Sequence, residues 1–419
     1  MAELGNDAPF HAHWPYAVIC NYPRTVRNIY KKETIMTSID RKEARYQRRV
    51  AARQEKKDNL ANKYTFDKVF SYANLYAAYK ECRKGVAWKA STQKCISEAP
   101  LIIAKLHREL MSGKFKSKGF YEFDIFERGK ERHIRSVTIE ERIVQRCLCD
   151  NALVPLLSRT FIYDNGASLK NKGYTFSQNR CAKHLRDHYN KYGNEGYVLV
   201  FDFSKFFDNI SHRVAKEILR ENIADSRILK LTEYFINVFG DVGLGLGSQV
   251  SQIMALASAN RLDHYIKEIL QIHGYGRYMD DGYLIHPSKE YLQECLEKIK
   301  VICDELEIKL NIKKTHIVKI THGFTFLKAK YYLLDNGKII KKLARVSITR
   351  MRRKLKKFKP KVDAGIMIPQ DVYQSWQSWR AYASNFNSYI TVRNMKRLYN
   401  DLYGEPKVEN DNSKEDEYG

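Results

Sequence analysis

The chain has 419 residues, and its 73 Lys and Arg exceed its 48 Asp and Glu by 25 positive charges. With 44% hydrophobic residues it can bury a sizeable core, so intrinsic disorder is excluded for most of the chain and about two to four subdomains are expected. An excess of positive charge this large predicts a polyanionic partner, and nucleic acid is the one that we expect.

The cysteines and the apolar runs bear on location. The eight cysteines include no CxxC pair and no cluster with histidine at zinc spacing. We therefore expect reduced core thiols in a cytoplasmic protein. No apolar run reaches about 18 residues, and the start lacks the pattern of a secretory signal, so neither secretion nor a membrane span is expected.

The N-terminal region divides into two parts. Residues 1–35 show no clear periodicity, whereas residues 40–62 have a charged, helical pattern. Met36 is a candidate natural start, which would make the preceding residues an accessory extension. Residues 41–57 carry eight bases and two acids, and a solvated helix face and a nucleic-acid contact are equally good interpretations of them.

From residue 66 onward the pattern predicts alternating helical and extended segments. A continuous apolar run at 197–203 is typical of a strand buried on both faces. In chain order we expect helices over 66–110, a hairpin with strands 120–126 and 132–137, a helix over 140–157, a basic loop over 164–173, a helix ending at Tyr192, the buried strand, and a further helix over 251–270.

Three aspartates are the candidates for chemistry. Asp202 lies at the end of the buried strand, and Asp280 and Asp281 lie between two short strands at 275–285. An acidic hairpin tip alone is usually a solvated turn, but a buried carboxylate among aromatic residues needs a cation. If the strands are neighbours, the three carboxylates converge and suit Mg²⁺. Two such ions can activate a 3′-hydroxyl and stabilise a leaving pyrophosphate, which indicates nucleotidyl transfer.

The ordered motifs resemble those of bacterial and phage reverse transcriptases, which are RNA-directed DNA polymerases. The residues that carry the resemblance are 201–210 (FDFSKFFDNI), 246–252 (LGSQVSQ) and 278–281 (YMDD), within a similar region from about 120 to 404. It implies an α+β right-hand polymerase fold with fingers, an antiparallel split-βαβ palm sheet and a helical thumb. The expected domains are an extension with a basic helix (1–62), fingers (63–195), palm (196–335, of which 211–245 packs partly with the fingers), thumb (336–404) and an acidic disordered tail (405–419).

The resemblance also implies roles for individual residues. Asp202, Asp280 and Asp281 are similar to the family's catalytic acids and, with Phe203, form the expected site for two Mg²⁺ ions, which Mn²⁺ can replace. Lys314 is the candidate proton donor to the departing pyrophosphate, and a plain surface lysine is the alternative.

Nucleotide selection is expected close to the acids. The ring of Phe207 would occupy the space of a ribose 2′-hydroxyl and so favour deoxynucleotides, with ordinary core packing as the alternative. The expected nucleotide-binding residues are Lys130, Arg132, Arg135, Phe203, Phe207, Leu246, Gly247 and Gln252.

Template and primer contacts are expected on basic surfaces of the fingers and thumb. Residues 350–361 contain eight bases, and residues 323–328 resemble the primer-grip hairpin. The aromatic residues between 373 and 386 recur at helical spacing, which favours a thumb core over a base-stacking platform. The expected template and primer residues are Lys170, Lys172, Phe326, Leu327, Arg352, Arg353 and Lys356.

One departure from the family pattern concerns the subtype. Gly245-Leu246 and Ser251-Gln252 stand where many reverse transcriptases have Pro-Gln and Ser-Pro. This resembles the diversity-generating retroelement type, which copies a template RNA with errors at adenines. A phage-defence (abortive-infection) enzyme and a group II intron-like enzyme are the alternatives within the family.

Two other function classes fit less well. An RNA-dependent RNA polymerase is disfavoured by Met279 and Phe207, and a non-catalytic RNA-binding cofactor by the three aspartates. The expected partners are template RNA, an RNA or DNA primer, dNTPs and a small basic accessory protein, with no membrane.

Overall fold

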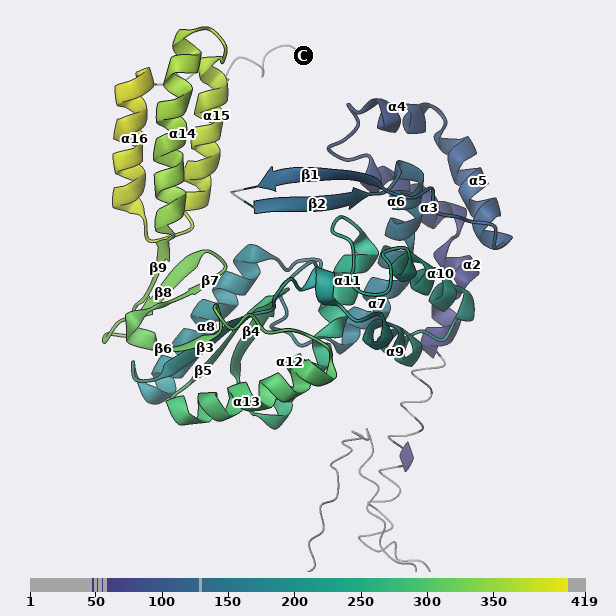
Figure 1. The fold of residues 1–419 in the computed structure, drawn as a ribbon, viewed down its shortest axis with the longest axis horizontal. Coiled ribbons are helices and arrows are strands. Elements are labelled where there is room, and N and C mark those ends of the chain that lie inside the picture. Colours follow the sequence, from purple (N-terminus) through teal and green to yellow (C-terminus); the bar gives the residue numbers. More distant parts are fainter. Residues whose placement is uncertain (1–46, 49–50, 52–54, 56–58, 128–129, 406–419) are drawn as a thin grey trace, which may run out of the picture. The chain divides into compact units, whose positions relative to one another are not determined.

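A four-stranded sheet carries both acidic motifs (Figure 1). The computed structural model describes residues 47–48, 51, 55, 59–127 and 130–405, and those from 59 onward belong to one compact unit. The sheet has the order β4-β5-β3-β6, and every neighbouring pair is antiparallel. Since β5 is antiparallel to both of its neighbours, β3 and β4 run in the same direction, as in a split βαβ unit. Its strands are β3 (Tyr197–Asp202), β4 (Gly274–Tyr278), β5 (Asp281–His286) and β6 (His316–Lys319).

Strand β3 is apolar throughout because both of its faces are covered. Leu199 and Phe201 belong to a core that includes residues of α13 (Lys289–Glu305), whereas Val198 belongs to a second core that includes residues of α8 (Tyr174–Tyr192). Because side chains alternate along a strand, a shift of register by one residue would exchange the two sets. Packing therefore fixes which residues of β3 and β5 lie opposite each other.

The chain before β3 and between the strands of the four-stranded sheet forms helices and one hairpin, β1–β2. The hairpin and the helix ending at Tyr192 occur where they were predicted. Described residues of the predicted 40–62 helix are helical, while residues 40–46, 49–50, 52–54 and 56–58 lie outside the described part. The elements are α2 (Phe66–Val69), α3 (Tyr72–Cys82), α4 (Ala90–Ser97), α5 (Ala99–Met111), β1 (Tyr121–Glu127), β2 (Lys130–Ser136), α6 (Ile139–Leu148), α7 (Val154–Leu157), α9 (His212–Asn222), α10 (Ser226–Asn237), α11 (Gln249–Ser258) and α12 (Asn260–His264).

Two predicted helices differ in detail from those observed. The helix predicted over 140–157 contains a π-helical turn, Cys149–Leu153, between α6 and α7. The helix predicted over 251–270 begins at Gln249 and is interrupted at Ala259 (φ −98°, ψ 6°), and a second π-helical turn, Tyr265–Ile269, ends it. Apolar spacing does not distinguish a straight helix from an interrupted one, because the same face is buried in both.

A second sheet connects the four-stranded sheet, which is the sheet expected in the palm, to the C-terminal helices. The four-stranded sheet is called the palm sheet below. It consists of β7 (Phe324–Phe326), β8 (Ala329–Leu333) and β9 (Ile339–Leu343), in that order. The hairpin predicted around 323–328 is therefore present as β7–β8. Strand β9 pairs with β8, so the palm–thumb boundary that we expected at residue 335 falls inside this sheet. The helical part of the expected thumb begins at Arg345.

Three helices, α14 (Arg345–Asp363), α15 (Pro369–Ala383) and α16 (Tyr389–Tyr403), form a bundle with its own apolar core. Trp376 is buried there and stacks on Tyr399, with ring centroids 5.2 Å apart. This packing favours the core interpretation of the aromatic residues over a base-stacking platform. The bundle agrees with the predicted helical thumb (Figure 1).

None of the seven cysteines in the described part forms a disulfide, and burial raises the pKa of Cys147 and of Cys303 to about 12. Cys20 lies outside the described residues. Among the described helices, none combines the length and apolar character that crossing a bilayer requires.

The separate core of the bundle predicts a local effect of substitution. Leu355 is 0% exposed within it, so Leu355→Ala should destabilise the bundle by about 2–5 kcal/mol. Hydrogen exchange of the α14–α16 amides should accelerate accordingly. Leu101→Ala is the matched control, since Leu101 is 73% exposed on α5 and should change stability by less than about 0.5 kcal/mol. Equal effects of the two substitutions would contradict the packing described.

Candidate active site

The end of β3 and the β4–β5 turn bring the acidic residues together. Asp202 and Asp281 are direct partners in the antiparallel β3–β5 ladder. The amide of Phe203 donates to the carbonyl of Asp280 over 3.0 Å. Directly opposite residues of such a ladder have Cα atoms about 4.5–5.5 Å apart. The side chains of Asp202 and Asp281 therefore share one face at the end of the sheet, beside Asp280.

Asp202 is buried, and two side chains from the segment after α13 contact its carboxylate. The ammonium of Lys314 lies 2.7 Å from Oδ2, and Asn311 donates from Nδ2 to Oδ1 over 3.1 Å. The backbone amide of Asn311 also donates to the Asp202 carbonyl over 2.8 Å. The structure thus brings Lys314 to the acidic cluster, as predicted, and adds Asn311, which the sequence did not single out.

The carboxylates interact unfavourably at this short range. Burial, the neighbouring charge of Asp280 and a hydrogen bond with Asp202 raise the pKa of Asp281 to about 7. Burial lowers the pKa of Lys314, but its hydrogen bond with Asp202 and the charges of the acids outweigh burial and raise it. Near neutral pH the cluster therefore retains a proton on one carboxylate and a charged ammonium beside another.

The donor atoms suit a hard divalent cation. The three side chains offer only oxygen ligands, which Mg²⁺ and Mn²⁺ favour. Among the described residues, no group of three or more Asp, Glu, His or Cys side chains is already arranged to hold a metal ion. Asn311 and Lys314 contact the two carboxylate oxygens of Asp202, Oδ1 and Oδ2 respectively. A cation that binds Asp202 would therefore have to replace one or both of these contacts.

Phe203 and Phe207 have different environments. Phe203 is buried in the core between Phe201 and Phe206, so only its backbone faces the acidic cluster. Phe207 is half-buried at the start of a short 3₁₀ turn, Phe207–Asn209, and its carbonyl accepts a hydrogen bond from the amide of Leu244 over 2.7 Å. This bond ties the residue to the loop before α11.

That loop brings several predicted nucleotide-binding residues near the β1–β2 hairpin. Gly247 has φ +107°, a conformation that favours glycine, and a Cβ there would lie 3.5 Å from the carbonyl of Arg135. Leu246 is half-buried and Gln252 is exposed on the first turn of α11. The guanidinium of Arg135 forms an ion pair with Glu122 across the hairpin. The side chains of Lys130 and Arg132 lie outside the described residues.

The predicted template lysines differ in what they contact. Lys170 is exposed and lines a cleft of about 800 Å³ together with Ser168, Gln249 and Gln252. Lys172 instead donates to the carbonyls of Tyr163 and Asn165 over 2.8 and 2.9 Å. These hydrogen bonds stabilise the loop. The placement of Lys172 therefore does not support the template contact that was predicted for it.

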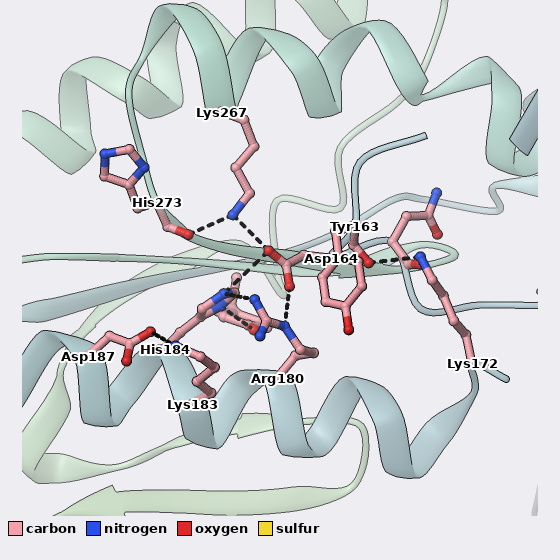
Figure 2. Close-up of polar contacts among 11 residues, drawn as sticks. Tyr163, Asp164, Lys172, Arg180, Lys183, His184, Asp187, Lys267 and His273 are labelled. Carbon is pink, nitrogen blue, oxygen red and sulfur yellow. Dashed lines mark hydrogen bonds and ion pairs between the residues drawn. The ribbon is translucent and has the colours of Figure 1, made fainter. Parts of the chain in front are cut away.

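Asp164 anchors the same loop, a role that the sequence did not reveal (Figure 2). Arg180, His184 and Lys267 all point at its carboxylate, with Lys267 3.0 Å away. Burial alone would raise the pKa of Asp164, but the hydrogen bonds from His184 and Arg180 and the charge of Lys267 move it well below its usual range. Burial lowers the pKa of His184, whose Nε2 lies 3.3 Å from Oδ2 of Asp164 and whose Nδ1 lies 2.9 Å from the hydroxyl of Tyr283.

The expected primer and thumb residues also fall into two groups. Phe326 and Leu327 are buried in the core between the two sheets, so their side chains are not available to a primer. Leu327 (φ +48°) and Lys328 (φ +62°) form the β7–β8 turn in the left-handed region, which is unusual without glycine. In α14 the side chains of Arg352, Arg353 and Lys356 are exposed, as a surface that binds phosphates requires.

Two telomerase structures have a limited likeness to this chain. One, from Candida albicans in complex with a TWJ fragment of telomeric RNA, has a TM-score of 0.42 at 13% identity and covers 68% of this chain and 55% of that one. The other, apo telomerase from Candida tropicalis truncated from its C-terminal domain, has a TM-score of 0.43 at 14% identity and covers 53% and 54%. Neither likeness bears on what this chain binds.

Two curated proteins and one family model match the sequence. The putative COX1/OXI3 intron 1 protein of Saccharomyces cerevisiae is 23% identical over 219 residues, 50% of this chain and 25% of that protein. Protein YkfC of Escherichia coli is 24% identical over 251 residues, 48% of this chain and 62% of that protein. The chain thus spans less than two thirds of either relative.

The family model for "Reverse transcriptase (RNA-dependent DNA polymerase)" matches residues 118–330, just over half of the chain, and includes all three aspartates. The chain therefore belongs to the reverse transcriptase family, and the right-hand polymerase fold predicted from its motifs is confirmed.

Proposed function

We propose that this protein copies an RNA template into DNA by adding deoxynucleotides to a primer 3′-hydroxyl. The observation that carries the proposal is the pairing of Asp202 with Asp281, beside Asp280, at one end of the palm sheet. The net charge of +25 supports binding of a nucleic-acid duplex through its phosphates. Exposed Arg352, Arg353 and Lys356 on α14 are candidates for those phosphate contacts.

Two Mg²⁺ ions fit the acidic cluster, and Mn²⁺ would fit the same oxygen donors. The carboxylates of Asp202, Asp280 and Asp281 and the backbone of Phe203 would hold them. When bound, such ions promote attack by the 3′-hydroxyl and stabilise the leaving pyrophosphate. The raised pKa of Asp281 supports this assignment, because a cation would relieve the repulsion that a retained proton now relieves.

Lys314 is suited to donate a proton to the leaving pyrophosphate. Its pKa is raised, so the ammonium is charged at neutral pH, and it lies 2.7 Å from the carboxylate of Asp202. A cation on Asp202 would compete for this contact and leave the ammonium able to reach a phosphate oxygen.

The loop before α11 and Phe207 are candidates for selecting the nucleotide. The half-buried ring of Phe207 would exclude a ribose 2′-hydroxyl. Leu246 replaces an amide side chain that many relatives carry, so it removes a hydrogen-bonding group near the incoming nucleotide. Relaxed selectivity would follow, because a site that makes fewer hydrogen bonds rejects incorrect partners less strongly.

From Leu246 and Gln252 we infer that the protein acts as the reverse transcriptase of a diversity-generating retroelement. The similarity to a yeast intron protein favours a group II intron-like enzyme as the second candidate. The DNA beside the gene distinguishes them, since a pair of template and variable repeats accompanies diversification and a surrounding intron accompanies mobility. Neither outcome changes the polymerisation chemistry.

The proposed chemistry is tested by primer extension on poly(rA) with Mg²⁺ and dTTP. The double variant Asp280→Asn, Asp281→Asn should lose activity by about a thousandfold or more, because cation binding contributes several kcal/mol to transition-state stabilisation. The matched control is Asp187→Asn, Asp304→Asn, which changes two exposed acids on α8 and α13. If both variants extend the primer equally well, the site assignment is wrong.

The role of Phe207 is tested by sugar selectivity. Phe207→Ala should raise the ratio of rNTP to dNTP incorporation by about tenfold or more, because it opens the space of the 2′-hydroxyl. Phe207→Tyr retains the ring and should keep the selectivity of the wild type. An unchanged ratio in the alanine variant would assign Phe207 to core packing alone.

The electrostatics of Asp281 predict how stability depends on pH in the metal-free protein. Its folded pKa of about 7 exceeds its ordinary value of 3.8, so its stabilising proton is retained at low pH and lost as the pH rises through 7. In EDTA the free energy of unfolding of the wild type should therefore fall between about pH 4 and about pH 7 relative to that of Asp281→Asn. The difference between the two proteins is the quantity to measure, because the lowered pKa values of buried His184 and His188 act with the opposite sign.

Adding Mg²⁺ at pH 8 provides the complementary measurement. The melting temperature of the wild type should rise more than that of Asp281→Asn, since the cation replaces the lost proton. Equal shifts in both proteins would exclude Asp281 as a ligand.

A further inference from the structure

Arg277 is a charged residue inside the palm sheet, and its side chain is 0% exposed. It lies in β4, two positions before the Met279–Asp280 turn. Its Nε and Nη2 donate to Oδ1 and Oδ2 of Asp263 over 2.7 and 2.6 Å, and Asp263 on α12 is also 0% exposed. The hydroxyl of Tyr275 donates to the same carboxylate over 2.6 Å. Buried ion pairs of this kind are often no more stabilising than apolar residues of similar volume, so stability alone does not explain the pair.

The remaining donors of the guanidinium reach two backbone carbonyls. Nη1 donates to the carbonyl of Met279 over 2.8 Å, and Nη2 donates to that of Leu256 over 3.1 Å. Leu256 is in the last turn of α11, where carbonyl groups lack partners within the helix. Arg277 thus connects the catalytic turn to the helix that carries Gln252.

Met279 is in a conformation that needs support. Its φ is +54°, in the left-handed region that a residue with an unbranched side chain adopts only at a cost. The residue directly precedes Asp280, so the orientation of its carbonyl sets the peptide plane from which Asp280 begins. The hydrogen bond from Arg277 fixes that carbonyl.

The backbone of Arg277 extends the connection to the loop anchored by Asp164. Its amide donates to the carbonyl of Asp164 over 3.2 Å, and its carbonyl accepts from the amide of Gly166 over 3.0 Å. Asp164 is itself held by Arg180, His184 and Lys267 (Figure 2). One residue therefore joins the catalytic turn, α11, α12 and the loop that carries Lys170.

We propose that Arg277, held in place by Asp263, is a positioning residue that keeps the Met279–Asp280 turn in register with Asp202. The proposal rests on the proposed function, since the acids that it positions are the proposed catalytic ones. Arg277 does not touch substrate in this role. It acts through the carbonyl of Met279 and so affects the rate of the chemical step more than binding of the primer and template.

A variant that removes the whole polar network without leaving a buried charge tests this role. Tyr275→Phe, Asp263→Leu, Arg277→Met replaces all three groups by apolar ones, so folding should be preserved while the carbonyl of Met279 loses its anchor. We expect kcat to fall by about tenfold or more, with the Kd for primer–template within about twofold of the wild type. The Mg²⁺ concentration for half-maximal activity should rise. Wild-type kcat in this variant would overturn the proposal.

Arg277→Lys is the second variant, for the case in which the triple variant does not fold. It keeps a cation opposite Asp263 but lacks the planar fork that reaches Asp263 and both carbonyls together. We expect a similar loss of kcat with primer–template binding unchanged, and full activity would again overturn the proposal. The control is Lys300→Arg, which exchanges the same two residue types in the opposite direction at an exposed position on α13. It should not change kcat.

A measurement that does not need activity separates this proposal from the proposed function. The amide of Phe203 donates to the carbonyl of Asp280, so its hydrogen exchange reports whether the turn is in place. Exchange in the peptide containing Phe203 should accelerate by about tenfold in the triple variant, while peptides from α13 stay unchanged. Unchanged exchange at Phe203 would refute the positioning role. An inactive wild type with accelerated exchange in the variant would instead refute only the proposed polymerase activity.

Discussion

Repulsion among three carboxylates at one end of a sheet is the constraint on which the rest of the site depends. Asp202 and Asp281 are opposite each other because β3 and β5 pack one set of side chains against α8 and the other against α13. A shift of one residue would exchange the side chains that the two cores accommodate and would move Asp202 away from Asp281. The two cores therefore supply the free energy that keeps like charges together.

The chain handles buried carboxylates in two opposite ways. Asp164 has three basic partners, and its pKa is lowered, so it is ionised under all ordinary conditions and serves as an anchor. Asp281 has acidic neighbours, and its pKa is raised to about 7. Burial raises the pKa in both cases, and the charges nearby decide the direction of the net shift. A carboxylate whose pKa is raised and that has too few basic partners is therefore the better candidate for binding a cation.

The sequence predicted the elements whose signal lies in residue type and spacing, and it missed the features that depend on which groups the fold brings into contact. The continuous apolar run revealed β3, and the order of the motifs placed Asp202 near Asp280 and Asp281, because each signal lies within a few residues. The inward turn of Lys172 depends on carbonyls of its own loop, and composition cannot distinguish such a lysine from Lys170. The burial of Phe326 follows from contact with Tyr283, which is more than forty positions away in the sequence. Arg277 carried a signal, a charge within an otherwise apolar strand, but its partner Asp263 lies on a helix that periodicity predicted only as one continuous segment.

Three hydrogen bonds to backbone carbonyl groups hold the segments that carry the acids in place. These bonds explain where the chain tolerates a strained backbone conformation. The amide of Phe203 donates to Asp280, the amide of Asn311 donates to Asp202, and the guanidinium of Arg277 donates to Met279. Lys205 (φ +43°) and Met279 (φ +54°) occupy left-handed conformations within three residues of an acid. Glycine would adopt these angles without strain, but it would also free the turns to adopt others. Residues with side chains restrict that freedom, and the surrounding hydrogen bonds offset their strain, so the turns are rigid in the arrangement that pairs the carboxylates. Of the three contacts, that of Arg277 alone depends on a particular side chain, so it is the contact that a single substitution can remove while the sheet stays intact.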